Sequence, residues 1–235
     1  DAVMLELTPR QQATLLSSPL FAALDTVVRD DLISRAQLRK FGDGQCIFNR
    51  GDPCNGFYIV LEGSVRISGI ARSGQQAILT FYEPGSWFGE ISIFDGLPRT
   101  HDAHAHKLTV LAHLHPADFE TLLDRYPTLS RMFLRIECAR LRLMAQVFEA
   151  YSTQGFEARL ANRLLMLAAT FGSPSSQGLR IELHLSQETL AQLVGATRQR
   201  INQVLQDWSH KGLVEQRRGF LALRDPAGLQ RIAEG

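Results

Sequence analysis

Glycine recurs throughout residues 37–115 at intervals that no long helix could accommodate. This region contains ten glycines, at positions 42, 44, 51, 56, 63, 69, 74, 85, 89 and 96. Between them lie short runs rich in β-branched and aromatic residues: QCIFN, GFYIVLEG, SVRISGI, QAILTFY and KLTVLAHLH. Many short strands separated by glycine turns predict an antiparallel sandwich or jelly roll.

The residues on either side of this region have helical spacing. Residues 10–36 contain few glycines, and Pro116 and Pro127 each begin a further helical pattern. Residues 128 to about 151 contain neither glycine nor proline. We therefore expect an α+β protein with a long helix after the strands.

The predicted long helix has two apolar rows. One row steps by four and three through Leu129, Phe133, Ile136, Arg140, Leu143, Val147 and Ala150. The second consists of Leu134, Cys138, Leu141, Ala145 and Phe148. A helix that is apolar on two sides is buried on two sides. We expect one row to face the sheet and the other to face a twin helix in a homodimer, with a core helix of a monomer as the alternative.

Composition excludes several classes of protein. No apolar run approaches the ~18 residues that a membrane span needs, and the first residues lack the basic start and apolar core of a secretory signal. The chain has three cysteines and no CxxC, which predicts free thiols in a reducing, cytoplasmic compartment and gives little support to a zinc site. No activated nucleophile, metal triad or phosphate-loop motif appears, so we expect no enzyme.

The stretch FGSPSSQG predicts a loop, and the region that follows it has the pattern of a helix-turn-helix followed by a wing. Ser186 is a plausible start for one helix, Gly195 ends it, and Thr197 can cap a second helix. The stretch GLVEQRRGFLALRD then predicts two strands around the basic turn Arg217-Arg218-Gly219. Residues 155–235 contain 10 basic and 7 acidic residues, a mildly basic balance that favours nucleic acid as a partner.

The second of these helices opens with TRQRINQ, which is too polar for a buried face. Arginine pairs with guanine, and glutamine or asparagine with adenine, so these side chains suit base reading. The candidates for base reading are Arg198, Gln199, Asn202 and Gln203. Further candidate DNA contacts, mostly to phosphates, are Ser186, Arg200, Lys211, Arg217 and Arg218. The alternative is an ordinary solvated helix face.

The order of these parts carries a resemblance that covers essentially the whole chain. The chain has four parts in order: a glycine-rich β-roll, a long helix, a hinge at STQG (152–155) and a winged helix. In this order it resembles the cyclic-AMP receptor protein (Crp/Fnr) family of bacterial transcription regulators. The resemblance implies a cyclic-nucleotide-binding domain over residues 1–127, a dimerisation helix and hinge over 128–155, and a winged helix-turn-helix domain over 156–235. The implied partners are palindromic double-stranded DNA, a twin chain bound through helix 128–151, and RNA polymerase.

The segment LAQLVGATRQRINQVL resembles the family's helix-turn-helix motif. On this resemblance Arg198 takes the place of the family's guanine-reading arginine. Gln199 stands where the family has a glutamate, and Gln203 where it has a second base-contacting arginine. We therefore expect the preferred operator sequence to differ from that of the best-known members.

The segment FGEISIFDGLPRT resembles the phosphate-binding cassette of the cyclic-nucleotide-binding domain. Arg99 can hold a phosphate with a two-pronged fork, and Glu90 can accept a hydrogen bond from a ribose hydroxyl. Without this context the pair is equally compatible with a surface salt bridge. The candidate ligand contacts in the segment are Gly89, Glu90, Ile91, Ser92, Arg99 and Thr100, with backbone N–H groups around Glu90 to Ser92 also expected to hold phosphate oxygens.

The part of the site that would contact the base departs from the family pattern. Alignment on the proline that starts the long helix puts Met144 and Ala145 where the family's adenine-contacting hydroxyl residues stand. Arg140, in the first apolar row of the same helix, is a further candidate ligand contact, alongside Met144. We expect a cyclic nucleotide effector, with cyclic AMP the first candidate and cyclic GMP the second. The alternatives are a vestigial pocket or another trigger, namely cyclic di-GMP, haem or a metal.

Histidines are concentrated just after the cassette. His104 and His106 are two residues apart, as are His113 and His115, so on strands each pair could share a face and chelate a metal. No carboxylate follows at the spacing of metal-dependent cupins. We expect exposed strand histidines and no metal site. A cupin-type enzyme fused to a DNA-binding tail is therefore the weakest alternative to a transcription regulator.

Overall fold

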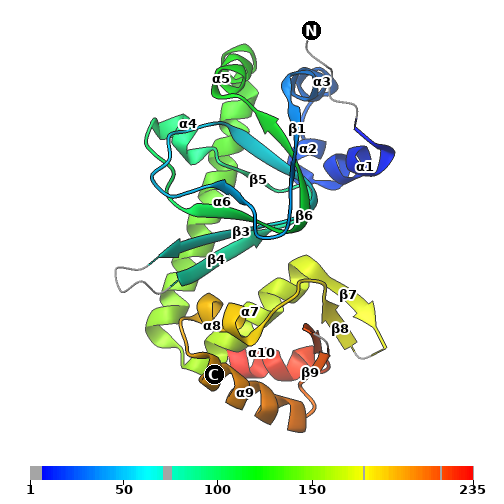
Figure 1. The fold of residues 1–235 in the computed structure, drawn as a ribbon, viewed down its shortest axis with the longest axis vertical. Helices are drawn as coiled ribbons and strands as arrows, with labels where there is room; N and C mark the ends of the chain where they lie inside the picture. Colours follow the sequence, from blue (N-terminus) through cyan, green and yellow to red (C-terminus); the bar gives the residue numbers. More distant parts are fainter. Residues whose placement is uncertain (1–6, 71–75, 177, 218, 235) are drawn as a thin grey trace. The chain divides into compact units, whose positions relative to one another are not determined.

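The computed structural model describes residues 7–70, 76–176, 178–217 and 219–234, with side chains at all of these except 19–20 and 150–153 (Figure 1). The chain forms two compact units, one of Asp1–Ile70 with Leu79–Ala139 and the other of Ala71–Ile78 with Arg140–Gly235. Among the described residues, no helix is long and apolar enough to cross a bilayer.

The first unit is a β-roll flanked by helices (Figure 1). Its strands are β1 (Gln37–Phe41), β2 (Cys46–Phe48), β3 (Phe57–Ile70), β4 (Gln76–Tyr82), β5 (Trp87–Phe88) and β6 (Asp102–Leu114). They form a six-stranded sheet in the order β1-β6-β3-β4, with β2 on β6 and β5 on β3. The pairings of β6 with β1, β2 and β3 are antiparallel, which confirms the predicted antiparallel β-roll.

Helices precede, interrupt and follow these strands. They are α1 (Pro9–Ser17), α2 (Pro19–Ala22), α3 (Thr26–Arg35), α4 (Ile91–Asp95), α5 (Pro116–Arg125) and α6 (Pro127–Thr153). Thr8 and Gln11 form a reciprocal capping box at the start of α1, and proline occupies the first turn of α1 and α5. These local signals explain why the helices begin where they do.

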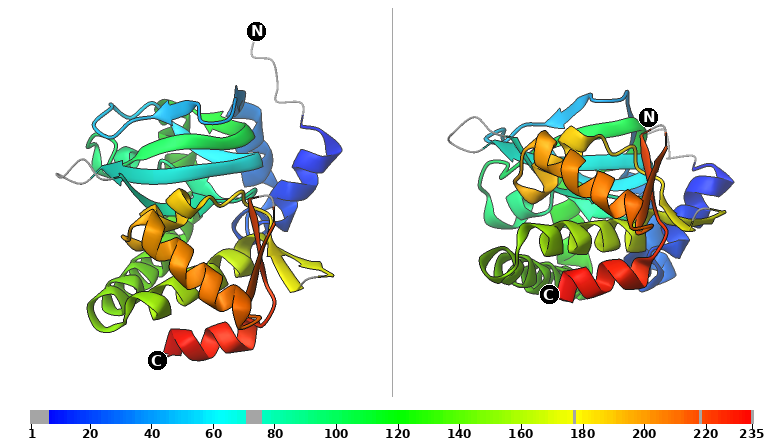
Figure 2. Two further views of the ribbon diagram at one scale, coloured as in Figure 1. Left: turned by 60° about the horizontal axis from the view of Figure 1, so that its bottom comes forward. Right: turned by 90° about the horizontal axis from the view of Figure 1, so that it is seen from below.

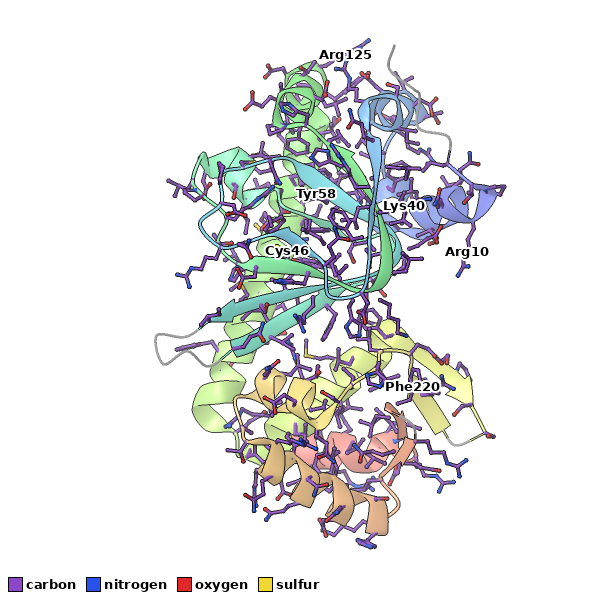
Figure 3. The ribbon with its side chains drawn as sticks, viewed as in Figure 1. Arg10, Lys40, Cys46, Tyr58, Arg125 and Phe220 are labelled. Atoms are coloured by element: carbon purple, nitrogen blue, oxygen red, sulfur yellow. The ribbon has the colours of Figure 1, made fainter. Side chains whose placement is uncertain are left out.

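Strand β3 is buried on both faces at its start, where the sequence reads FYIVL. Phe57, Ile59 and Leu61 join a core cluster with residues of α1, α3, α5 and α6. The alternate residues Tyr58 and Val60 point into a second cluster with Phe48 and Phe88. Tyr58 is drawn inside the roll in Figure 3, whereas Arg10 and Arg125 extend outward. A strand buried on both sides has a continuous apolar run because successive side chains alternate between faces.

The long helix α6 uses its two apolar rows differently. Leu129 and Phe133 of the first row are buried, with 1% and 2% of their surfaces exposed, and pack in the core of the first unit. Along the second row, Leu134, Leu141 and Phe148 remain 64–76% exposed. This second row, Leu134-Cys138-Leu141-Ala145-Phe148, is called the seam below. Its spacing of four and three is that of a two-stranded coiled coil.

The described part of the second unit contains the helices α7 to α10 and a four-stranded sheet. Its elements are α7 (Phe156–Phe171), β7 (Gly172–Ser175), β8 (Gly178–Ile181), α8 (Gln187–Val194), α9 (Arg198–His210), β9 (Val214–Arg217), β10 (Phe220–Leu223) and α10 (Pro226–Glu234). The antiparallel sheet has the order β7-β8-β10-β9. Helix α10 lies alongside α7 in Figures 1 and 2. The winged helix-turn-helix predicted from the sequence is confirmed.

Three expected element boundaries differ from those in the structure. The stretch FGSPSSQG, read from its glycines, serines and proline as a loop, contains β7 and leads into β8, because β8 pairs with both β7 and β10. The expected hinge at 152–155 is shorter than predicted, since α6 continues to Thr153 and α7 begins at Phe156. SVRISGI and GFYIVLEG, expected as two strands, form the single strand β3 with bulges around Glu62.

Candidate functional site

Arg99 is the centre of the candidate ligand site in the first unit. Its side chain is only 3% exposed. The guanidinium donates from Nη1 to the carbonyl oxygen of Gly89 at 2.6 Å, and from Nη2 to Asn55 Oδ1 at 2.7 Å and to the carbonyl oxygen of Gly56. Its main chain is also held, because Arg99 N donates to Asp52 O and its carbonyl accepts from Gly51 N, both at 2.8 Å. The loop between β2 and β3 therefore fixes Arg99 at both ends.

The direct hydrogen-bond partners of this guanidinium are electrically neutral, although the buried side chain of Glu90 lines the same cavity. Its acceptors are two main-chain carbonyls and one amide, and no carboxylate of the described residues lies within ion-pair distance of it. The ring of Phe48 lies under the cation, 4.3 Å from ring centroid to Cζ. A buried charge without an opposite charge costs several kcal/mol. The site is therefore arranged to receive an anion.

Gly89 brings the backbone into close contact with the side chain of Arg99. Its φ is +90°, a conformation that side chains rarely adopt. A Cβ atom at this position would lie 3.0 Å from Arg99 Nη1 and 3.1 Å from the Gly56 carbonyl oxygen. Glycine thus allows the turn between β5 and α4 to lie directly against the guanidinium.

The other residues of the cassette surround the same cavity. Glu90, 2% exposed, and Ser92, 3% exposed, are buried beside it, while Ile91 and Thr100 lie nearer solvent. Glu90 precedes the first turn of α4, and its main-chain carbonyl oxygen accepts from the N–H groups of Ile93 and Phe94. Helix α4 has five residues, so the expected phosphate contact of its first N–H groups stays a prediction.

The cavity has a volume of about 50 Å³. That is room for a few waters or a phosphate group, and far less than the ~300 Å³ or more of a site that encloses a whole small molecule. Its lining combines the cassette with an aromatic and aliphatic wall: Phe48, Ile67, Tyr82, Phe88, Gly89, Glu90, Ile91, Ser92, Arg99, Thr100 and His101. The cavity is therefore large enough for a charged group such as phosphate and too small for a whole nucleotide.

The structure adds residues of the site that the sequence analysis missed, some in the cavity lining and one that binds Arg99. Phe88 stacks with Tyr58 and Tyr82, at centroid separations of 5.2 and 5.6 Å. His101 lines the cavity, its Nδ1 lies 2.8 Å from Thr100 Oγ1, and burial lowers the pKa of its imidazole. Asn55 was missed because it lies 44 positions before Arg99, and only the fold brings the two together.

Two candidate ligand contacts, Arg140 and Met144, lie on the part of α6 that belongs to the second unit. Met144 is 64% exposed. Their contact with a ligand stays a prediction.

The prediction that the strand histidines are exposed is wrong for His113, which is 8% exposed on β6. His104 and His106 are half-buried on the same strand, and His115 is exposed and caps α5 by accepting from Ala117 N. The two pairs therefore lie in different surroundings. In the part of the chain that the structure describes, no group of three or more histidine, cysteine or acidic side chains is placed to hold a metal ion.

The helix-turn-helix of the second unit is capped as predicted. Ser186 Oγ accepts from Thr189 N at the start of α8, and Thr197 Oγ1 accepts from Arg200 N at the start of α9. Gly195 ends α8 in the left-handed conformation, with φ +67°. Helix α9 buries Ile201, Val204, Leu205 and Trp208 against the unit's core. The opposite side of α9 is thereby left for solvent or a partner.

The candidate DNA contacts on α9 divide into two groups. Arg198, Gln199 and Gln203 are exposed near the helix start, where base-reading residues of helix-turn-helix proteins lie. Two others make contacts within the chain: Arg200 pairs with Glu157 at 3.7 Å, and Asn202 Oδ1 accepts from Gln187 Nε2 at 2.9 Å.

The other basic candidates for DNA contact lie at the end of α9 and on the wing. Arg217 lies at the end of β9 and pairs with Glu215 at 2.5 Å. Lys211 pairs with Asp207 at 2.7 Å just beyond α9. Arg218 lies outside the described residues. The DNA roles of all these side chains stay predictions.

Comparison with known proteins matches both units to families. Residues 38–126 match the model of the cyclic nucleotide-binding domain, and residues 158–232 match the model of the Crp-like helix-turn-helix domain. Over 225 residues the chain is 31% identical to a CRP-like cAMP-activated global transcriptional regulator of Mycobacterium tuberculosis, covering 93% of this chain and 98% of that protein. The chain belongs to the Crp/Fnr family of transcription regulators.

Solved structures of Crp/Fnr proteins agree with this assignment. A CRP/FNR-family transcriptional regulator from Thermus thermophilus superimposes with a TM-score of 0.71 at 26% identity, covering 85% of this chain and 99% of that one. The c-di-GMP responsive global regulator CLP of Xanthomonas campestris has the same fold, with a TM-score of 0.73 at 21% identity and coverage of 85% and 99%. Regulators of the Crp/Fnr family bind DNA and form dimers. This Crp/Fnr chain thus joins a cyclic nucleotide-binding domain to a DNA-binding domain.

Proposed function

We propose that this Crp/Fnr regulator binds a cyclic nucleotide with its phosphate at Arg99, and that the bound nucleotide controls its affinity for a palindromic operator. The buried guanidinium of Arg99 carries the proposal, because its three acceptors are all neutral and no carboxylate of the described residues lies within ion-pair distance of it. An anionic ligand would supply the missing negative charge. The family of the chain makes a cyclic phosphate the natural anion.

Cyclic AMP is the first candidate for this effector. The relative from Mycobacterium tuberculosis is described as cAMP-activated, which favours cyclic AMP. Cyclic GMP stays the second candidate, and the responsiveness of the Xanthomonas campestris regulator to c-di-GMP adds that dinucleotide to the ligands to test. The small cavity holds a phosphate and leaves the base outside, so phosphate capture alone does not select between bases.

A packed route connects the site with α6. Glu90 and Ile91 line the cavity, and Phe94 follows them one turn later on α4. The ring of Phe94 lies 5.6 Å from that of Phe133, a core residue of α6, and 5.8 Å from that of Phe119. A ligand that shifts α4 would therefore act directly on the helix that bears the seam. Control of DNA binding requires only that the ligand bind one packing of this helix more tightly than another.

Titration calorimetry with cyclic AMP, cyclic GMP and cyclic di-GMP tests the proposed effector directly. We expect saturable binding of at least one nucleotide, and a change in operator affinity when that nucleotide is present in a gel-shift or anisotropy assay. Binding of none of the three would refute the nucleotide assignment. Binding without any effect on operator affinity would refute the control of DNA binding.

The seam is the proposed homodimer surface, and Leu141→Glu tests it. Leu141 is 64% exposed in the single chain, and a charge at the centre of a coiled-coil seam opposes pairing. We expect Leu141→Glu to shift the protein from dimer to monomer in light scattering coupled to size exclusion. The control is Gln146→Glu, which adds the same charge on the exposed side of α6 away from the seam. A Leu141→Glu protein that remains dimeric would contradict the seam.

A further inference from the structure

His113 is a buried polar residue within an apolar segment of β6, which reads VLAHL at residues 110–114. Its Nε2 lies 2.8 Å from the main-chain carbonyl oxygen of Asn55. Because a carbonyl oxygen can only accept, Nε2 carries the proton and donates. The imidazole packs on Tyr58 with the ring centroids 4.9 Å apart.

The electrostatic surroundings keep this imidazole neutral. Burial lowers the pKa of His113, and the nearby positive charges of Arg39, His115 and Arg99 act in the same direction. The hydrogen bond to Asn55 acts in the opposite direction. With the pKa lowered in this way the ring is neutral at pH 7, and the neutral tautomer with its hydrogen on Nε2 donates this hydrogen bond.

His113 donates a hydrogen bond to Asn55 and packs against Gly56, and these same two residues accept hydrogen bonds from Arg99 Nη2. Asn55 supplies its side-chain oxygen and Gly56 its carbonyl oxygen to the guanidinium. Gly56 has a φ of +142°, and a Cβ atom there would lie 2.1 Å from His113 Nε2. The imidazole of His113, which projects from strand β6, therefore lies directly against the Asn55–Gly56 backbone. The same two residues bind Arg99.

A purely space-filling role does not explain the choice of histidine. An aliphatic residue of similar volume would fill the space and match the apolar neighbours of His113 on β6. It would leave the carbonyl oxygen of Asn55 without this donor, in the segment that positions Arg99. The donor at Nε2 is what distinguishes histidine here.

We propose that His113 is a positioning residue of the anion site: its Nε2–H fixes the Asn55–Gly56 segment, and that segment orients the guanidinium of Arg99 toward the cavity. The contact with a ligand rests on the proposed function above. The positioning itself is a property of the protein without ligand. The two can therefore be tested separately.

The first test uses nitrogen NMR on the nucleotide-free protein. We expect His113 to show the shifts of a neutral ring protonated at Nε2 at pH 7, and the side-chain N–H signals of Arg99, assigned by their loss in Arg99→Lys, to show restricted rotation. In His113→Leu these Arg99 signals should lose that restriction, whereas His113→Gln, which keeps a donor, should retain part of it. His104→Leu, on the same strand, is the control and should leave them unchanged.

A His113 ring protonated at Nδ1 overturns the proposal in the unmodified chain, whether or not the variants fold. Unchanged Arg99 signals in a folded His113→Leu protein overturn it as well. Because these readouts need no ligand, they decide the role of His113 even if the chain binds no cyclic nucleotide, an outcome that would refute the proposed function alone.

The second test measures nucleotide affinity by calorimetry. We expect His113→Leu to weaken binding of the nucleotide found in the screen by about tenfold, and His113→Gln to recover part of the loss. In an Arg99→Lys background the same change should have little effect, because His113 acts through Arg99. Equal losses in both backgrounds would show that His113 acts independently of Arg99 and would overturn the proposal.

Discussion

Arg99→Ala is expected to abolish measurable cyclic-nucleotide binding while the protein stays folded. Removing one partner of a buried, hydrogen-bonded charge pair costs about 2–5 kcal/mol, or roughly 30- to 5,000-fold in Kd. Arg99 is 3% exposed and is the cation that the site presents to an anion. Calorimetry gives the affinity, and circular dichroism with thermal melting reports whether the variant folds.

Two further substitutions sharpen this experiment. Arg99→Lys keeps the charge but loses the two-pronged fork, so its affinity should fall between those of wild type and Arg99→Ala. Arg10→Ala removes an exposed arginine from α1 and serves as a control that should bind as wild type does. An Arg99→Ala protein with undiminished affinity would mean that the ligand binds elsewhere.

Arg198→Ala is expected to weaken specific operator binding by about 1–3 kcal/mol, or roughly 5- to 150-fold, and to relax the preference at one base pair of each half-site. Arg198 is exposed at the first position of α9, directly after the Thr197 cap, where a recognition helix contacts base edges. Selection from a randomised operator library, followed by anisotropy titrations, measures both effects.

Arg200→Ala provides the contrast on the same helix. Arg200 is paired with Glu157 and lies over the ring of Phe156, so it is less available to a base than Arg198. We expect a small, sequence-independent loss of affinity from Arg200→Ala. If Arg198→Ala selected the same operators as wild type with the same affinities, Arg198 would have no role in reading bases.

Local signals in the sequence were enough to locate many elements. QAILTFY coincides with β4 because glycine and proline bound a run of β-forming residues on both sides. The ends of α8 and α9 were predictable because Ser186, Gly195 and Thr197 act through their own immediate neighbours. FGSPSSQG was misread because β7 is specified by its pairing with β8, and β8 in turn pairs with β10 about forty residues later, so the composition of the stretch does not reveal the strand.

The same distinction applies to the candidate ligand site. Gly89, Glu90, Ser92 and Arg99 lie within one short segment, and the resemblance of that segment to the phosphate-binding cassette predicted a common site. Asn55 and His113 reach that site from β-roll segments on either side of it in the chain. Neither carries a local pattern, since an asparagine in a glycine-rich loop and a histidine on a strand have many uses. Only the register of the sheet brings them next to Arg99.

The three hydrogen bonds of the Arg99 side chain have a kinetic meaning as well. Immobilising a long, flexible side chain on binding costs about 0.5–1.5 kcal/mol, and here the fold has already restricted Arg99 before any ligand arrives. Such preorganisation means that an arriving phosphate meets a cation already in position and need not wait for one to be recruited from solvent. Differences in affinity between nucleotides should then appear mainly in how long each stays bound, with association rates nearly constant across the series.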